Sequence, residues 1–307
     1  MANISFIWDG KTQTPIETTK NYYQGPTSGY FHPTSSSMEW TGLNLTYLVS
    51  DSVLPTAGTL TSLKNVQNSG VWSMTITGIS TVIPAKSTFD LLVAEIVKGK
   101  DDWYGDESNN FFYASVGGDT FHGGGGIDTL DAFINKANWV TPSTKFTKLN
   151  NGYIQVTNFG TTSFTLDSVE RLKFADVSLA LDLDGNAGKT AKILGAVFGA
   201  SSLSNKNYVG IGLSLLDAGM DTKKLLDLAL TTKLGSNYTS EAEIKLLYTN
   251  VFNLTPSAST LDVLKGLIDN GYCSRSDLGY IISETANNQT NINLTGLAQN
   301  GIEYTPQ

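Results

Sequence analysis

Oxygen-bearing side chains recur every nine residues in the middle of this 307-residue chain. They belong to three aspartates and one asparagine, which are Asp101, Asn110, Asp119 and Asp128. Each is followed two positions later by a large apolar residue, giving Trp103, Phe112, Phe121 and Leu130. Glycine is concentrated beside them, although each glycine in a regular element costs about 0.5–1 kcal/mol relative to alanine. Carboxylates beside glycine-rich backbone are suited to binding a hard cation through oxygen.

The region divides into four units of nine residues, 96–104, 105–113, 114–122 and 123–131. The last, "GGGGIDTLD", matches G-G-x-G-x-D-x-U-x at every specified position, and this is the nonapeptide of calcium-binding parallel β-helices. The other three units each keep a glycine, the acid or amide, and the apolar residue. Four units in register predict a short calcium-binding β-roll, whereas a plain glycine-rich loop without metal is the alternative.

The predicted roll places its ligands in pairs. Calcium takes six to eight oxygen ligands at about 2.3–2.6 Å, and turn carbonyls point inward most readily where glycine allows a positive φ. Because successive turns alternate between the two edges, an ion is expected between turns eighteen residues apart. This pairs Asp101 with Asp119, and Asn110 with Asp128, the second site being weaker because Asn110 is uncharged. The candidate metal residues are Gly99, Asp101, Gly105, Asn110, Gly117, Asp119, Gly123, Gly124, Gly126 and Asp128.

Elements of two kinds flank these units. Apolar residues alternate in 43–49 and 72–76, which predicts half-buried strands, and a helix is expected from Ser87 to Gly99. After the repeats, Asn151 and Gly152 predict a two-residue hairpin turn, and 163–174 and 177–184 predict further strands. From Lys189 onward apolar residues recur at i, i+3 and i+4, and two stretches of this helical part align at an offset of about 53 residues.

The expected fold class is therefore α+β and multidomain. Residues 1–95 are expected to form a β-rich domain ending in a helix. Residues 96–184 are expected to form the calcium-binding β-roll with its flanking strands, and residues 185–307 an α-helical domain.

Composition excludes several classes of partner. The net charge of −8 and the pI near 4.8 disfavour nucleic acid and anionic membranes, which attract basic surfaces. One cysteine, Cys273, allows no internal disulfide. No Sec-type signal peptide is found at the N-terminus, and no apolar run reaches the roughly 18 residues of a membrane span.

Catalytic motifs are missing as well. The two histidines, His32 and His122, form no H-E-x-x-H, and G-x-S-x-G does not occur. Gly188-Lys189-Thr190 lacks the glycine that a phosphate loop needs at position 183, where Leu183 stands. His122, in the ninth position of its unit, is expected to be an ordinary strand residue. The sequence therefore predicts a protein that is not an enzyme.

The repeat array resembles the repeats-in-toxin family of type I secreted bacterial proteins. Residues 164–199, with "VERL" and "FAD", resemble the segment that follows such repeats, and 246–271 resembles an uncharacterised helical domain found at their C-termini. The resemblance implies export by a type I ABC system through a signal in the C-terminal domain, an extracellular location, and folding on meeting calcium. Only one nonapeptide is complete, so calcium sites are expected to be few and structural.

These features lead to an expected function as a calcium-dependent cell-surface or matrix protein that self-assembles, as in an S-layer, filament or biofilm. A monomeric adhesin or carbohydrate-binding module, taking a surface glycan on aromatics of the N-terminal sheet, is the alternative, and an enzyme of unrecognised type is a remote one. Ile4, Phe6 and Trp8 alternate in "NISFIW". This strand is expected either to pair within its own sheet or to add to the sheet of a neighbouring copy.

Overall fold

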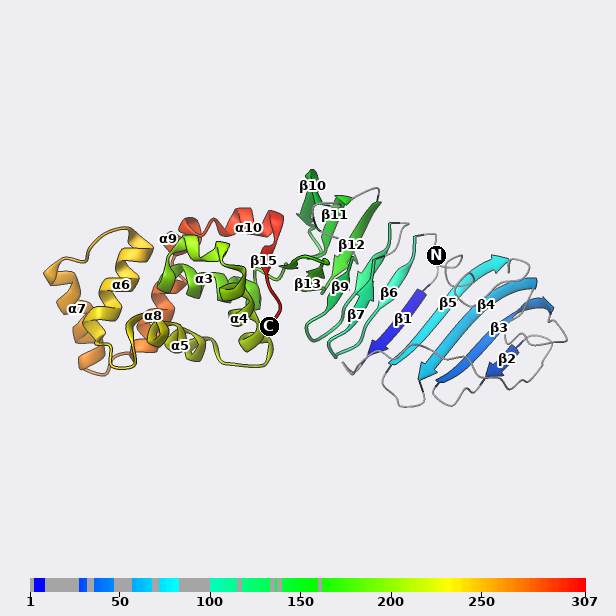
Figure 1. The fold of residues 1–307 in the computed structure, drawn as a ribbon, viewed down its shortest axis with the longest axis horizontal. Coiled ribbons are helices and arrows are strands. Elements are labelled where there is room, and N and C mark those ends of the chain that lie inside the picture. The colour runs from blue at the N-terminus through cyan, green and yellow to red at the C-terminus, as the bar shows by residue number, and fades with distance from the viewer. Residues whose placement is uncertain are drawn as a thin grey trace. The chain divides into compact units, whose positions relative to one another are not determined.

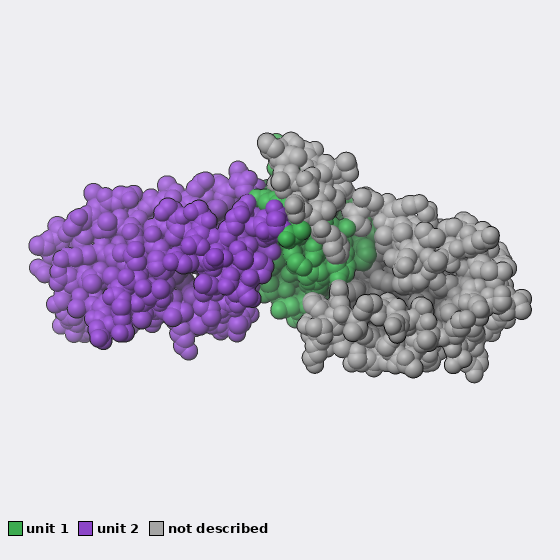
Figure 2. All heavy atoms as spheres, in the orientation of Figure 1, with its two compact units in different colours: residues 1–175 green, residues 176–307 purple. Residues whose placement is uncertain are grey.

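The computed structural model describes ten stretches of the chain: 3–8, 28–31, 36–46, 57–67, 72–82, 100–114, 118–132, 136, 140–159 and 162–307. Before residue 83 it describes the backbone of the strands alone. The chain divides into two compact units, Met1–Ala175 and Asp176–Gln307 (Figure 2). The boundary expected at residues 184–185 lies within the second unit, and the helix expected from Ser87 to Gly99 lies outside the described residues.

Strands of two mixed sheets make up the described part of the first unit (Figure 1). Ten form one sheet in the order β10-β11-β12-β8-β6-β1-β5-β4-β3-β2, and β13, β9 and β7 are consecutive in the other. The early strands are β1 (Asn3–Trp8), β2 (Ser28–Phe31), β3 (Ser36–Thr46), β4 (Ala57–Gln67) and β5 (Trp72–Val82). The later ones are β6 (Asp102–Tyr104), β7 (Phe111–Tyr113), β8 (Thr120–His122), β9 (Thr129–Asp131), β10 (Val140–Lys148), β11 (Ile154–Phe159), β12 (Thr162–Asp167) and β13 (Arg171–Lys173).

The N-terminal strand pairs on both of its edges within the chain. Strand β1 runs antiparallel to β5, with Ile4 opposite Ile76, and parallel to β6, with Ile4 opposite Trp103. Strand β1 therefore pairs with β5 along its whole length and with β6 at Asn3, Ile4 and Ser5, which agrees with the expectation that it pairs within its own sheet. Donation of β1 to a neighbouring copy does not agree with this pairing.

The nine-residue units form short strands that stack in parallel one coil apart. Trp103 of β6 lies opposite Phe121 of β8, and Phe112 of β7 lies opposite Leu130 of β9. Both pairs are separated by the eighteen residues expected from the sequence. Strands alternate between the two sheets, because β6 and β8 belong to one and β7 and β9 to the other.

A further layer of strands continues both stacks after an insertion. Leu166 of β12 lies opposite Phe121, and Leu172 of β13 lies opposite Leu130, both in parallel pairing. The apolar residues of these strands form the interior of the first unit. Those that are at most 1 % exposed are Phe112, Phe121, Leu130, Leu166 and Leu172.

The inserted hairpin differs in its turn from the sequence-based expectation. The Gly152 N–H donates to the Leu149 carbonyl (2.9 Å) and the Leu149 N–H donates to the Tyr153 carbonyl (2.7 Å). Asn150 and Asn151 are thus the central residues of the turn, and Gly152 follows with φ +90°. The predicted two-residue turn at Asn151–Gly152 is wrong, because a three-residue loop places its left-handed residue after a type I turn.

The described residues of the second unit contain eight α-helices, one 3-10 turn and two strands. The helices are α3 (Asn186–Phe198), α4 (Lys206–Asp217), α5 (Thr222–Leu234), α6 (Ser240–Phe252), α7 (Ala258–Asp269), α8 (Arg275–Ser283), α9 (Ala286–Asn291) and α10 (Leu294–Asn300). The 3-10 turn is η1 (Ala200–Ser204), and β14 (Ser178–Ala180) pairs antiparallel with β15 (Ile302–Tyr304).

The helical duplication inferred from the sequence agrees with the helix boundaries. Helices α3 and α6 each have 13 residues, and α4 and α7 each have 12. Both α4 and α7 are followed, two residues after their last residue, by a glycine with positive φ, Gly219 and Gly271. An equivalent backbone hydrogen bond is formed at each end, because the Gly219 N–H donates to the Leu216 carbonyl and the Gly271 N–H donates to the Ile268 carbonyl.

One carboxyl group is buried inside the helical unit. Glu243 of α6 is fully buried, and among the described residues no group donates a hydrogen bond to either of its side-chain oxygens. Burial raises the pKa of Glu243 to about 7, Arg275 lowers it and Asp227 raises it further. Arg275 donates instead to the Tyr238 carbonyl at 2.8 Å, so it leaves Glu243 without a hydrogen bond.

Replacing Glu243 by methionine is expected to stabilise the helical unit in alkaline solution. The native pKa lies above its unfolded value, so Glu243 favours folding below about pH 4.5 and this contribution disappears as the pH rises through about 7. Glu243→Met should therefore raise the free energy of unfolding by about 1–3 kcal/mol at pH 8 and by less at pH 5. Urea unfolding followed by circular dichroism at 222 nm measures both values.

Glu241→Met is the matched control, since Glu241 lies in the same helical turn but pairs with Lys245 at the surface. Its effect should stay within about 0.5 kcal/mol. Equal destabilisation by Glu243→Met at both pH values would contradict the role assigned to the buried carboxyl.

Candidate metal site

Two columns of side chains form where the short strands begin. The Asp101 N–H donates to Asp119 Oδ1 at 2.9 Å, and the Asn110 N–H donates to Asp128 Oδ1 at 2.6 Å. The second column continues, because the Asp128 N–H donates to Glu170 Oε2 at 2.8 Å. The two pairs expected from the eighteen-residue spacing are thus in contact. Asp101, Asn110, Asp119 and Asp128 are each at most 2 % exposed.

The turns that precede Asn110 and Asp128 stack on one another. The Gly125 N–H donates to the Asp106 carbonyl at 2.9 Å, and the Ile127 N–H donates to Asn109 Oδ1 at 2.8 Å. Within the turn that precedes Asn110, the Asp106 N–H donates to Asn110 Oδ1 at 2.7 Å. The two turns therefore hold each other in register through backbone and side-chain hydrogen bonds.

Glycine is required in these turns for two different reasons. Gly124 and Gly126 have φ values of +96° and +91°, which side chains of other residues rarely accept. Gly105 and Gly123 have no positive φ but lie too close to oxygen atoms to carry a Cβ. A Cβ on Gly123 would lie 1.8 Å from the Ser168 carbonyl oxygen, and one on Gly105 would lie 2.2 Å from the Gly123 carbonyl oxygen.

Oxygen atoms converge on the space above both of these glycines. Asn110 Oδ1 and the Gly123 carbonyl oxygen face the position above Gly105. Asp128 Oδ2 and the Ser168 carbonyl oxygen face the equivalent position above Gly123. Each position thus combines a side-chain oxygen of its own turn with a carbonyl of the next turn along the column.

Asp128 is the group of this column whose ionised form is disfavoured by its surroundings. Burial raises its pKa to about 7, and repulsion from Glu170 and Asp106 adds to the rise, while the hydrogen bond from the Asn110 backbone opposes it. Within the described part of the chain, its Oδ2 atom has no hydrogen-bond partner. A cation beside Asp128 Oδ2 would replace the missing partner and offset the repulsion.

The column that contains Asp101 and Asp119 is described only in part. The two glycines expected in this column, Gly99 and Gly117, lie outside the described residues. Gly118, their neighbour in the second of these turns, has φ +86°. The Thr120 N–H donates to the Asp101 carbonyl at 2.8 Å, which extends the same ladder toward β8.

No group of three or more His, Cys, Asp or Glu side chains within the described ranges could hold a metal ion by itself. A cation in the second column would therefore depend on main-chain carbonyls and the Asn110 amide as well as on Asp128. These are the oxygen donors that calcium accepts.

Sequence reasoning did not identify Ser168 and Glu170. They form the third turn of the column, but the inserted hairpin places Glu170 at a separation of 42 residues from Asp128 and so breaks the spacing. Ser168 takes a positive φ of 53° where glycine would be expected. The available signal was Leu172, a buried apolar residue two positions after an acid, as in the repeats.

The outer surface of the same strands carries a histidine contact. His122 Nδ1 lies 2.7 Å from Asp167 Oδ2, and the His122 ring stacks on Tyr104 with centroids 4.6 Å apart. His122 is thus a strand residue, as expected, and its contact with Asp167 joins neighbouring strands β8 and β12.

Comparisons with protein-family models, with curated proteins and with solved structures found no match to this chain. Across the described ranges, the helices are too short or too polar for any of them to traverse a lipid bilayer.

In chelator, the first unit is expected to lose stability as the pH rises from about 4 to 8. Asp128 has a native pKa of about 7 against 3.8 when unfolded, so the native state binds its proton more tightly in this range. Asp128→Asn should remove this part of the pH dependence. Tryptophan fluorescence during urea unfolding in chelator reports on the first unit, because all five tryptophans precede residue 176. An unchanged pH dependence in Asp128→Asn would show that other groups cause the loss.

Gly123→Ala is expected to destabilise the first unit by several kcal/mol, because its Cβ meets a backbone carbonyl that cannot move independently. Gly125→Ala is the matched control in the same turn. Its Cβ meets chiefly the end of the flexible Glu107 side chain, at 2.4 Å. The measurement is again urea unfolding by tryptophan fluorescence, and similar effects of both substitutions would contradict the close stacking of the turns.

Proposed function

We propose that this chain is a secreted bacterial protein that needs calcium to fold its first unit, and that it serves as a structural component of the cell surface or extracellular matrix. The observation that carries the proposal is the column of Asn110, Asp128 and Glu170, in which Asn110 and Asp128 are buried beside glycine turns. Buried carboxylates in this arrangement are unfavourable unless a cation compensates them.

In this proposal the stacked short strands are a parallel β-roll, and its turns hold calcium. Asp128 Oδ2, Asn110 Oδ1 and the carbonyls of Gly123 and Ser168 supply oxygen ligands on one edge. Asp101 and Asp119 supply carboxylates on the other. Calcium supplies positive charge to these turns, and its binding free energy adds to the free energy of folding.

The proposed location also rests on the resemblance of the repeats to the repeats-in-toxin family. Extracellular calcium is abundant enough for weak sites, which in extracellular modules have dissociation constants of about 10⁻⁴–10⁻³ M. Because folding would require calcium, the chain would remain unfolded until it has passed through the type I secretion system. The export signal is placed in the second unit on the same basis.

Self-assembly is proposed from the ends of the larger sheet. Its order begins at β10 and finishes at β2, so among the described strands these two lie at the edges and offer backbone groups to another copy. The net charge of −8 opposes contact between copies, and calcium would reduce that repulsion. Assembly through sheet edges therefore fits a calcium-dependent matrix or surface layer.

Calcium titration of the chelator-treated full-length chain tests the proposal. Tryptophan fluorescence and thermal unfolding should respond with half-saturation at about 0.1–1 mM calcium, and saturation at 100 times the dissociation constant should add about 2.7 kcal/mol. Light scattering should rise over the same range. Asp128→Asn should weaken binding by about tenfold, the equivalent of about 1.4 kcal/mol.

Asp262→Asn, an equal change of charge on exposed α7, serves as the control and should titrate as the wild type does. The absence of any calcium response in fluorescence and unfolding would overturn the proposal. Calcium-dependent folding without an increase in scattering would retain the calcium site, reject self-assembly, and direct attention to a monomeric adhesin that binds a surface glycan.

A further inference from the structure

An apolar pocket of about 190 Å³ lies in the second unit, between helices α3, α4 and α5. Thr190 and Phe198 of α3 both line it, and their eight-residue separation corresponds to about 12 Å along the helix. Gly212 of α4 packs closely against Thr190, since a Cβ there would lie 2.6 Å from Thr190 Cγ2. The lining therefore extends along about two turns of α3.

The rim of the pocket is apolar and accessible. Tyr208 and Ile211 of α4 and Leu228 of α5 line it, and they are 43 %, 45 % and 45 % exposed. Ala229 of α5 lies on its wall. An exposed apolar rim around an apolar cavity favours a hydrocarbon ligand.

A positive charge stands beside Phe198, one of the lining residues. Lys233 Nζ lies 5.8 Å from the centroid of the Phe198 ring, and among the described residues no carboxylate pairs with Lys233. By contrast, the neighbouring cation Lys223 pairs with Asp277, and Lys192 with Glu284. Lys233 is thus placed to receive an anionic group from a molecule whose apolar part occupies the pocket.

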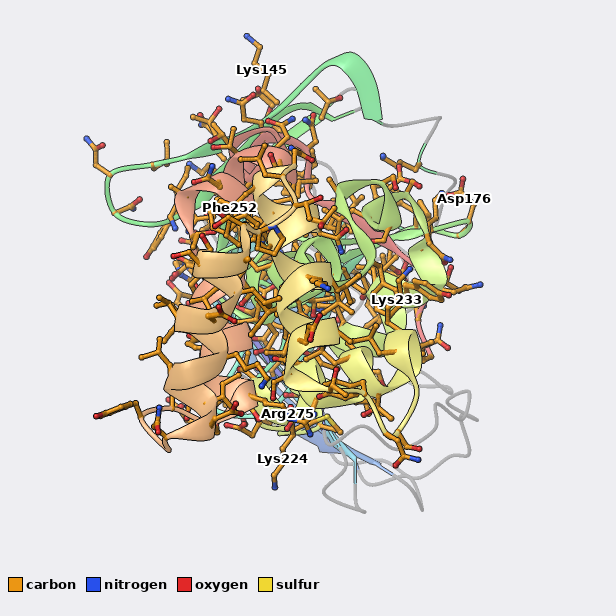
Figure 3. The ribbon with its side chains drawn as sticks, turned by 90° about the vertical axis from the view of Figure 1, so that its left-hand side faces the viewer. Lys145, Asp176, Lys224, Lys233, Phe252 and Arg275 are labelled. Atoms are coloured by element: carbon orange, nitrogen blue, oxygen red, sulfur yellow. The ribbon has the colours of Figure 1, made fainter. Side chains whose placement is uncertain are left out.

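We propose that this pocket binds the alkyl chain of a medium-chain carboxylate, with Lys233 near the carboxylate and the chain directed toward Thr190. The stretch of about 12 Å that the lining covers along α3 suits an extended chain, and most of the lining residues are apolar. Lys233 lies beside Phe198 of the lining, whereas Lys224, on the same helix, points to a different side of the molecule (Figure 3). This inference is independent of the calcium-binding proposal.

Isothermal titration calorimetry of the full-length chain with hexanoate, octanoate and decanoate, all below their micelle-forming concentrations, tests it. Decanoate should bind with one site per chain, and affinity should rise about fourfold for each added methylene. Lys233→Gln should weaken decanoate binding about two- to fivefold, as expected for an exposed ion pair, whereas Lys224→Gln should leave it unchanged. Decyltrimethylammonium, with the same chain and the opposite charge, should bind more weakly than decanoate.

Two further variants test the location. Ala229→Leu should fill the pocket, reduce decanoate binding at least tenfold and retain the helical circular dichroism signal. Leu228→Gln changes an exposed rim residue and should also weaken binding, which keeps the test valid if Ala229→Leu does not fold. No saturable binding of decanoate, or equal binding by wild type and both variants, would overturn the proposal. If the chain does not bind decanoate but self-associates, and Leu228→Gln abolishes the self-association, the pocket is an interface with a second copy. That result would also overturn the proposal.

Discussion

The first unit depends on acidic side chains stacked directly above one another, of which Asp101, Asp119 and Asp128 are buried. Each acid accepts a hydrogen bond from the backbone of the preceding coil, so the side chain fixes the distance between coils and the backbone fixes the position of the side chain. The Asn110 N–H to Asp128 and the Asp128 N–H to Glu170 bonds are successive steps of one such column. Negative charges brought together in this way repel, and their burial removes the water that would otherwise screen them.

Glycine makes that stacking possible through space as much as through conformation. At Gly123 the carbonyl of Ser168 occupies the volume that a methyl group would need. The turns consequently approach closely enough for oxygen atoms of two successive turns to face the same space. Below them, the buried rows that include Phe121 and Leu130 supply apolar contact between coils. The unit therefore combines an apolar interior with turns whose electrostatics favour a bound cation.

The second unit is stabilised by different interactions, chiefly an apolar core and helix capping. Its repeated helix pairs are held by equivalent contacts, and side-chain amides connect their ends. Asn250 donates to the carbonyls of Ala196 and Val197 at the end of α3, and Asn291 donates to the carbonyls of Asn250 and Val251 near the end of α6. These bonds satisfy carbonyls that a helix end leaves without partners. The core also contains Glu243, whose burial opposes stability as the pH rises.

The sequence by itself determined the elements with a strict local period. The nine-residue spacing of Asp101, Asn110, Asp119 and Asp128 was sufficient to place strands, turns and the pairing of residues eighteen apart, since a coil of constant length repeats its contacts. The helical duplication was equally visible, because cap residues and apolar spacing are local signals. Tertiary structure alone decided what crosses an insertion or comes from distant helices. Glu170 joins the column because strand pairing continues beyond the hairpin, and the pocket is lined by residues of α3, α4 and α5 that lie apart in the sequence. Neither has a fixed spacing along the chain, so no sequence period could report it.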